Sequence, residues 1–490
     1  MQRLNNATVP TLPPEVTVPS YDRSEITPGI VHLGIGAFHR AHQAPLLDDC
    51  LSRGETTWGI IGASLRSGDT RNALIPQDSL YTLATRQGRS QKLRVVGSIA
   101  DVLVGPDNPR ALVAVLADPR IRIVTLTITE KGYTANLASR DLRHDHPDVV
   151  HDLSSPSQPR SALGFLVEAI RIRRQQGVPS FTVLSCDNIP ANGPTLKLLL
   201  VQFASLRDQD LASYIEESVS CPSCMIDRIV PATTDRDRAE ISGALGLADA
   251  WPVVAEPFWQ WVIEDSFPSG RPRLELSGVE FVEDVEPYEN MKIRLLNGAH
   301  TTIAAIGRAT GMVTVADVHA DDRVRRFIEA YWRQVEKTLP AFLKTKKYTA
   351  DLSERFSNTA LQHRTEQIAM DASQKLPQRI ISPLADLTDA FQERSLLLFA
   401  LAVWIRSCMP TNEHGDAIVL NDPFEQHLAA AVRAGDPKAI VEAIFQIDGI
   451  FGDRWLSDRA AIVDVACFLA LIQREGVLNA TEALLSHRSD

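Results

Sequence analysis

The fold is decided by one stretch near the start of the chain, Ile30-Val-His-Leu-Gly34-Ile-Gly36-Ala-Phe38-His39-Arg40-Ala-His42. An apolar run of strand type ends in Gly-x-Gly, and a helix is expected to begin directly afterwards. Gly34 would permit a tight turn, and Gly36 would let a dinucleotide pyrophosphate approach the backbone at the helix N-terminus. His39 stands where the usual fingerprint has its third glycine, so an ordinary strand–helix turn remains the alternative interpretation.

The half of the chain around this turn alternates β-rich runs with helical stretches. Candidate strands span 30–35, 58–65, 93–96, 122–128 and 181–185. Several of them are apolar throughout, which is typical of strands covered on both faces. A helix is expected at 161–176, and Gly177 is expected to end it. This alternation predicts an α/β fold class with a Rossmann-type, mostly parallel, doubly wound sheet.

The pattern changes after about residue 282. Helices are expected at 323–337, 393–407, 423–434 and 462–473. The loop-like segment 268–272, with Gly and two Pro, lies just before the change. We therefore expect a cofactor-binding Rossmann-type domain over 1–282 and a mostly helical substrate and catalytic domain over 283–490.

Composition bounds the class of protein. The 490 residues are 44% hydrophobic and 23% charged, which suits two globular domains. A net charge of −11 argues against a nucleic-acid binder but leaves a small anionic substrate possible. The polar N-terminus lacks the apolar core of a signal peptide, and no apolar run reaches the roughly 18 residues of a membrane span. Six cysteines are too sparse for a disulfide framework, so we expect a cytoplasmic protein. We expect it to be a monomer or a small homo-oligomer.

An acidic residue after the second strand of such a fold holds the adenosine ribose. Asp69 follows the run at 58–65, although its distance from Gly36 exceeds the usual spacing of about 20 residues. A carboxylate accepts hydrogen bonds from a 2′-hydroxyl and repels a 2′-phosphate, which favours NAD over NADP. The alternative is a solvated aspartate in a turn beside Gly68.

A second polar cluster reads Tyr288-Glu289-Asn290-Met-Lys292-Ile-Arg294-Leu-Leu-Asn297-Gly-Ala-His300. On an α-helix, its offsets of five and three residues would spread Lys292, Asn297 and His300 over a wide face, with His300 between the other two. Oxidation of a secondary alcohol removes the hydroxyl proton as hydride leaves carbon. A lysine can accept that proton when burial and a positive nicotinamide lower its pKa, and asparagine can stabilise the alkoxide. The alternative is a polar helix face at a domain boundary.

These two motifs together resemble the long-chain polyol and sugar-acid dehydrogenases, the mannitol dehydrogenase family. Further matching segments are Ser185-Cys-Asp-Asn188, Met225-Ile-Asp227-Arg-Ile-Val-Pro231 and Glu256-Pro-Phe-Trp-Gln-Trp-Val-Ile-Glu-Asp265. The matches run nearly end to end and in the right order. The resemblance implies a Rossmann-type N-terminal domain, a helical C-terminal domain and a cleft between them.

The resemblance also implies catalytic roles. Lys292 would be the general base, with Asn188 and Asn297 as the oxyanion donors. His300 would orient the substrate, and Glu289 would exchange protons with solvent. The reaction would be NAD-dependent and would need no metal.

Cofactor and substrate contacts follow from the same resemblance. Asp69 would govern cofactor choice, and Asp227 would lie beside the substrate and the nicotinamide. The expected cofactor contacts are Gly34, Ile35, Gly36, Ala37, Phe38, Arg40, Asp69, Thr129 and Asp227. The expected substrate contacts are Asn188, Asp227, Lys292, Asn297, His300, Lys131, Arg364 and Lys375.

Two segments distinguish the substrate types of the family. They read Thr129-Glu-Lys131-Gly-Tyr133 and His363-Arg364-Thr-Glu-Gln367-Ile-Ala-Met-Asp371-Ala-Ser-Gln-Lys375-Leu-Pro377-Gln-Arg379. Both look like the mannonate type, since mannitol-type members carry Gly where Lys131 stands and Arg where Gln367 stands. Ala372 departs from both types, which usually have Gly there, and this puts the local backbone in doubt. The segment 248–254 looks as much like the mannitol type.

A sugar acid carries a carboxylate that a hexitol lacks, and Lys131 or Arg364 could bind it. Surface solvation is the alternative for both side chains. The sequence thus favours D-mannonate and D-fructuronate as the substrate pair. D-mannitol and D-fructose, or a related arabinitol or sorbitol, form the alternative.

The sequence also contains features of two other classes of protein. Cys221-Pro-Ser-Cys224 has the spacing of half a zinc site, but no second pair follows, so buried thiols are the simpler reading. A non-catalytic NAD- or sugar-sensing protein on the same fold is an alternative of another class. The intact set of Lys292, Asn297 and His300 argues against it.

Overall fold

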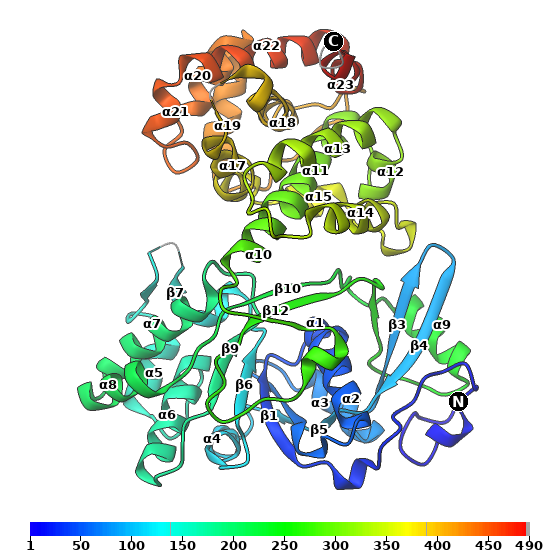
Figure 1. Ribbon diagram of the computed structural model, residues 1–490, viewed down its shortest axis with the longest axis vertical. Coiled ribbons are helices and arrows are strands. Elements are labelled where there is room, and N and C mark those ends of the chain that lie inside the picture. Colours follow the sequence, from blue (N-terminus) through cyan, green and yellow to red (C-terminus); the bar gives the residue numbers. More distant parts are fainter. Residues whose placement is uncertain (138, 389, 487–490) are drawn as a thin grey trace. The chain divides into compact units, whose positions relative to one another are not determined.

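The structure is a computed structural model that describes residues 1–137, 139–388 and 390–486 (Figure 1). The chain divides into two compact units, Met1–Glu286 and Pro287–Asp490. The boundary expected from the sequence lies just before this division. No helix within the described ranges is long and apolar enough to cross a membrane.

Five parallel strands form the central sheet of the first unit. They are β1 (Pro28–Leu33), β2 (Gly59–Ser64), β5 (Ile99–Val104), β6 (Ile123–Leu126) and β9 (Thr182–Ser185), in the order β5-β2-β1-β6-β9. From β1 the chain steps outward to β2 and β5, then returns to β6 and β9 on the other side of β1. The strand order therefore reverses between β1 and β6, the point where ligands bind in open α/β sheets. The expected doubly wound sheet is confirmed.

Alternating side chains explain why both faces of this sheet are covered. Val31 and Leu33 of β1 pack into one core, whereas Ile30 packs into another. Figure 1 shows helices on either side of these strands. One core includes residues of α4 (Pro109–Ala117), α6 (Ala162–Gln175) and α7 (Asn192–Ser205), and the other includes residues of α2 (Gln43–Ser52). Apolar strands without polar alternation are the expected result.

Smaller sheets and helices complete the first unit. The strands are β10 (Cys224–Asp227), β12 (Gln260–Glu264) and β13 (Glu280–Val282) in one sheet; β11 (Val253–Ala255), β3 (Tyr81–Gln87) and β4 (Ser90–Val96) in another; and the pair β7 (Ala135–Asn136) and β8 (Asp141–Leu142). The remaining helices are α1 (Ala37–Ala41), α3 (Asp69–Leu74), α5 (Pro147–Ser154), α8 (Gln209–Ser218) and α9 (Asp235–Leu245). The strand expected at 93–96 thus belongs to β4, outside the parallel sheet.

Helices make up the second unit, as the sequence predicts. They are α10 (Glu286–Met291), α11 (Gly298–Thr310), α12 (Val315–His319), α13 (Asp322–Glu336), α14 (Thr345–Phe356), α15 (Thr365–Ala369), α16 (Ala372–Leu376), α17 (Ser382–Asp386), α18 (Phe391–Ser407), α19 (Glu425–Ala431), α20 (Pro437–Phe445), α21 (Asp453–Ser457), α22 (Arg459–Glu475) and α23 (Val477–Ser486). Helix α18 is buried along all of its residues from Arg394 onward and packs against α11 and α22. Two π-helical turns, Lys292–Asn297 and Pro377–Ile381, interrupt the α-helical pattern.

Candidate functional site

The turn after β1 contains two glycines, Gly34 and Gly36, which serve different purposes. Gly34 has φ +93°, and a Cβ there would lie 2.1 Å from the carbonyl oxygen of Thr127. The fold itself therefore requires Gly34. Gly36 is exposed at the N-cap of α1, and a Cβ there would meet only the Gly34 carbonyl oxygen, at 3.8 Å. No described residue comes close enough to require glycine at position 36, and its lack of a side chain leaves the backbone open to a ligand.

The residues that follow differ in what they can offer a ligand. Ile35 is buried, and its side chain occupies the space that a Cβ on Gly62 would fill. The Arg40 guanidinium is buried as well, donating to the carbonyl of Trp251 at 2.5 Å, and burial lowers its pKa to about 10. Ile35 and Arg40 can thus contact a cofactor only through their backbone. For Arg40 this excludes a cofactor contact through the guanidinium. Ala37 and Phe38 are half-buried.

His39 replaces the third glycine by stacking on His32 of β1. The two ring centroids are 3.5 Å apart and the planes are nearly parallel. His32 is hydrogen-bonded to the hydroxyls of Thr125 at 2.7 Å and Thr127 at 2.9 Å. Burial lowers the pKa of His32 to about 3 and holds that of His39 well below its ordinary value. A neutral imidazole pair therefore fills the strand–helix contact.

This histidine pair makes the first unit sensitive to acid. Both rings are neutral when folded, whereas unfolded histidines titrate near pH 6.5, so the unfolded chain binds more protons as the pH falls below that value. The stability that His32 contributes is present above about pH 6.5 and is lost toward about pH 3, by up to about 1.4 kcal/mol per pH unit, and the contribution of His39 is lost in the same direction. The urea midpoint should fall more from pH 7 to pH 5 in the wild type than in His39→Phe, whose ring stacks without titrating. Equal losses in both proteins would contradict this account.

Further predicted residues lie at the carboxyl edge of the same sheet. Asp69 begins α3 after β2, is exposed and accepts a hydrogen bond from the Ser67 hydroxyl at 2.8 Å. Thr129 follows β6 with φ +62°, and exposed Asn188 follows β9. Because parallel strands end at a common edge, these three residues share the edge with the glycine turn. Asp227 is buried at the end of β10, in a different sheet.

A residue without a predicted role, Asp187, organises part of this edge. Its carboxylate accepts hydrogen bonds from the backbone N–H groups of Ile128 at 3.0 Å and Thr129 at 2.9 Å, and from the Tyr133 hydroxyl at 2.8 Å. Burial raises its pKa. These bonds fix the turn after β6, which exposes Lys131. The signal was present in the sequence, since Asp187 directly precedes Asn188.

In the second unit, Lys292 and Asn297 begin and end a π-helical turn. The N–H of Gly298 donates to the carbonyl of Ile293, five residues back. On an α-helix, residues five apart face directions about 140° apart. The wider π turn brings Lys292 and Asn297 to nearly the same side. The wide spread expected from α-helical geometry was therefore wrong for this pair, and π turns of this kind are frequent at functional sites.

Buried aromatic and cationic groups surround His300. Its ring lies 4.7 Å from that of Phe356 and 5.1 Å from that of His363, centroid to centroid. Burial, followed by the neighbouring His363, Arg355 and Arg379, holds the pKa of His300 well below its ordinary value. His300 is consequently a neutral imidazole, able to hydrogen-bond a hydroxyl without carrying charge. Sequence reasoning assigned no role to His363, Arg355 or Arg379.

Arg379 also supports the π turn. Its guanidinium donates to the Thr301 hydroxyl at 3.0 Å, and that hydroxyl donates to the carbonyl of Asn297 at 3.0 Å. Burial lowers the pKa of Arg379 to about 10, so it remains a cation at neutral pH. The positive charge of Arg379 is therefore held at Thr301, the residue that directly follows His300.

Arg364 lies apart from this environment. It is in extended backbone beside Thr314, so its side chain points opposite to that of His363, which contacts His300. Arg364 is 59% exposed, ion-pairs with Glu366 at 3.6 Å and lines a separate groove with Arg308. Arg364 therefore faces away from His300, and its expected contact with the substrate stays a prediction.

The remaining predicted residues of the second unit have local roles. The Lys375 ammonium donates to the backbone carbonyls of Ile368, at 3.3 Å, and Met370. Glu289 is half-buried on α10, just before the π turn. Ala372 is accommodated without strain, because the left-handed backbone conformation falls on Asp371, with φ +52°.

The cysteine pair is packed within the first unit. The Cys224 thiol donates to the carbonyl of Ser185 at 3.1 Å, and burial raises the pKa of the Cys221 thiol to about 12. Over the ranges that the structure describes, no group of three or more His, Cys, Asp or Glu side chains is placed to hold a metal ion. The geometry gives the pair a packing role.

Comparison with known proteins covers both units. The mannitol dehydrogenase Rossmann domain matches residues 28–276, and the mannitol dehydrogenase C-terminal domain matches residues 284–466. D-mannonate oxidoreductase of Escherichia coli is 41% identical over 449 residues, covering 89% of this chain and 92% of its own. Mannitol 2-dehydrogenase of Pyricularia oryzae is 37% identical over 477 residues, 94% of each chain.

A solved structure matches the whole chain. The ternary complex of Pseudomonas fluorescens mannitol 2-dehydrogenase with NAD and D-mannitol is 35% identical, with a TM-score of 0.83. The match covers 99% of this chain and 100% of that one. The chain belongs to the mannitol dehydrogenase family of oxidoreductases.

Proposed function

We propose that this oxidoreductase transfers hydride between NAD(H) and a secondary alcohol of a sugar acid, with D-mannonate and D-fructuronate as the substrate pair. The observation that carries the proposal is the π-helical turn that brings Lys292 and Asn297 to one side. A cytoplasmic setting and a monomer or small homo-oligomer remain part of the proposal, as does a domain division near residues 282 and 283.

The first unit offers a fitting site for the cofactor. The backbone at Gly36 is exposed and carries no side chain that would block a pyrophosphate, and Asp69 lies at the same sheet edge for the ribose. We place cofactor contacts at Gly34, Ile35, Gly36, Ala37, Phe38, Arg40, Asp69, Thr129 and Asp227, those of Ile35 and Arg40 through the backbone. NAD supplies the hydride acceptor when bound.

Four kinds of side chain carry out the oxidation of the alcohol in this proposal: a lysine, two asparagines, a histidine and a glutamate. Lys292 is only 7% exposed, so its amine is largely shielded from bulk water. Its Nζ takes the hydroxyl proton as the carbon–hydrogen bond breaks and the carbonyl forms. The side-chain N–H groups of Asn188 and Asn297 stabilise the negative charge that develops on oxygen. His300 orients a neighbouring hydroxyl, and Glu289 returns the proton to solvent.

Charge favours a sugar acid as the substrate. A desolvated carboxylate is costly without a cation, and Arg355 and Arg379 place positive charge beside His300. The identity of 41% to D-mannonate oxidoreductase points the same way. Mannitol and fructose are the alternative, favoured by the 35% identity to a structure that holds D-mannitol.

Cofactor choice provides one prediction. In Asp69→Ala, the affinity for NAD should fall and discrimination against NADP should weaken, because a ribose acceptor and a charge that repels the 2′-phosphate are lost together. The ratio of kcat/KM for NADH to that for NADPH is the measurement. Asp107→Ala, an exposed aspartate that ion-pairs with Arg71, is the matched control. An unchanged ratio in Asp69→Ala would contradict the assignment.

A substrate panel tests the function itself. NADH consumption should be fastest with fructuronate among fructuronate, tagaturonate, fructose and xylulose. Incubation with EDTA should leave the rate unchanged. Fast fructose reduction with no fructuronate activity would replace the proposal by the mannitol alternative, and NADH binding without turnover of any ketose would favour a sensing protein.

A further inference from the structure

Two adjacent side chains of α13 donate hydrogen bonds to the π-helical turn that carries Lys292 and Asn297. The Trp332 indole N–H donates to the carbonyl of Leu295 at 3.0 Å. The Tyr331 hydroxyl lies 3.4 Å from the carbonyl of Arg294, a longer and weaker contact. Tyr331 is fully buried and Trp332 is buried too. One helix therefore places two donors on consecutive residues of the turn.

The two carbonyls lie where the backbone hydrogen-bond pattern changes. An α-helix would direct the N–H of Gly298 to the carbonyl of Arg294, but here it donates to Ile293. The carbonyls of Arg294 and Leu295 thus lie where the backbone hydrogen bonds change from the five-residue spacing of the π turn to the four-residue spacing of α11. Buried carbonyls that leave an α-helical ladder need other donors. Side chains of α13 provide them.

Packing around Gly298 shows how closely this arrangement is fitted. A Cβ on Gly298 would lie 2.2 Å from the Tyr331 hydroxyl oxygen and 2.9 Å from the carbonyl of Arg379. The Tyr331 hydroxyl also lies 3.5 Å from that Arg379 carbonyl, in the second π-helical turn. Both π turns therefore meet at one phenol. Gly298 directly follows Asn297, so this close packing against Tyr331 lies beside a proposed catalytic residue.

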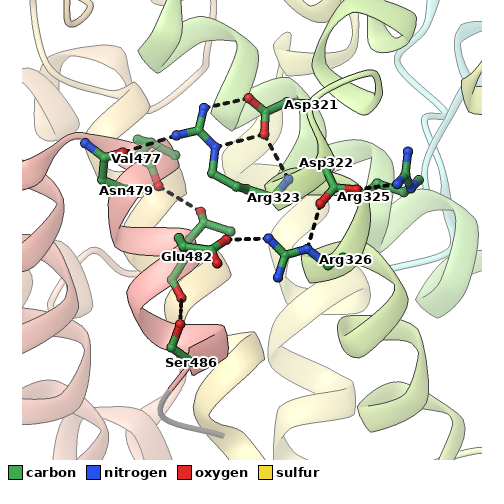
Figure 2. A network of polar contacts seen from close by, with 10 residues as sticks. Asp321, Asp322, Arg323, Arg325, Arg326, Val477, Asn479, Glu482 and Ser486 are labelled. Atoms are coloured by element: carbon green, nitrogen blue, oxygen red, sulfur yellow. Dashed lines mark hydrogen bonds and ion pairs between the residues drawn. The ribbon is translucent and has the colours of Figure 1, made fainter. Parts of the chain in front are cut away.

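Helix α13 is held along its length, which makes it a firm support. Figure 2 shows its N-terminal half tied to α23. Arg326 ion-pairs with Glu482 at 2.5 Å, and Arg323 donates to Asn479 at 3.1 Å. Near the other end, the side chain of Gln334 accepts a hydrogen bond from the N–H of Leu397 on α18 at 3.2 Å.

We propose that Tyr331 and Trp332 are positioning residues for catalysis. They hold the π turn in the five-residue step that brings Lys292 and Asn297 to the same side, and they act on the chemical step through that turn. This inference rests on the proposed function, in which Lys292 is the base.

The test compares Tyr331→Phe and Trp332→Phe with the wild type, using the ketose that the wild type reduces fastest. Loss of either donor should lower kcat by about 10- to 100-fold, since small displacements of catalytic groups cost rates of that order. The NADH dissociation constant, measured by fluorescence titration, should not change. The primary isotope effect with deuterated NADH should rise as hydride transfer becomes slower.

A control separates this role from general stabilisation. Tyr214→Phe removes a hydroxyl on α8, in the first unit, and should keep wild-type kcat. If Tyr331→Phe does not fold, Trp332→Phe decides the question.

Wild-type kcat and isotope effect in the folded variants, with only the melting temperature lowered, would overturn the inference, as would failure of both variants to fold. Lys292→Ala is measured alongside. If it keeps wild-type turnover, the proposed function fails; if it is inactive while both α13 variants are normal, only the positioning inference fails.

Discussion

Replacement of Lys292 by alanine should lower turnover by about 100- to 10,000-fold, the usual cost of removing a general base. The reason is local, because Lys292 begins the π turn and is buried beside Asn297 on the same side. Without its amine, no group at that position accepts the hydroxyl proton as hydride leaves. The NADH dissociation constant should remain close to the wild-type value, because the proposed cofactor contacts lie in the first unit.

Three measurements make this expectation specific. Steady-state kcat gives the loss, and fluorescence titration gives the NADH affinity. Lys438→Ala, which removes an exposed lysine of α20, is the matched control and should keep full activity. Addition of a small primary amine should restore part of the activity of Lys292→Ala and none to the control. Turnover near the wild-type level in Lys292→Ala would remove the base from the mechanism.

Sequence patterns predicted the fold because the decisive features are local. Apolar runs of strand type and Gly34 fix β1, and the strands at β2, β6 and β9 follow from the same pattern. The strand β5 was not expected, although it pairs with β2 in the parallel sheet. Its Asp101 interrupts the apolar run, and pairing in the sheet outweighs that local signal. Pairing between distant segments cannot be read from local periodicity, which also explains the placement of β4.

The residues proposed for the site came from the resemblance to a family, and their geometry could not be read from the sequence. The resemblance singles out Lys292 and Asn297, yet periodicity assumes a regular α-helix and cannot anticipate a π turn. That turn depends on donors from α13, which is distant in sequence. The direction of Arg364 could not be predicted for a related reason, because neighbouring residues in extended backbone face opposite sides and the sequence does not say which side holds the site.

A large effect on KM is also expected when the residues that bind the substrate carboxylate are replaced. Arg355 and Arg379 are the cations that we propose to bind this carboxylate, because both act electrostatically on His300. Arg379 is fixed by its bond to Thr301, and Arg355 is buried at the end of α14. A guanidinium offers two parallel N–H donors to a carboxylate, which strengthens and orients the contact. A hexuronate would therefore bind more tightly here than the uncharged hexose of the same shape.

Arg355→Ala should raise KM for fructuronate by roughly 10- to 150-fold, the equivalent of a charge-assisted hydrogen bond worth about 1.5–3 kcal/mol. Arg379→Ala should raise it as well, but should also lower kcat with both ketoses, because Arg379 supports the π turn through Thr301. KM for fructose should change far less, since fructose has no carboxylate to lose a partner. Arg364→Ala and Lys131→Gly serve as comparisons: both side chains are exposed, and Arg364 already pairs with Glu366. If Arg364→Ala alone raises KM for fructuronate, the carboxylate is bound where the sequence first suggested. If every variant loses fructuronate and fructose activity in equal proportion, these cations support the fold of the second unit rather than the choice of substrate.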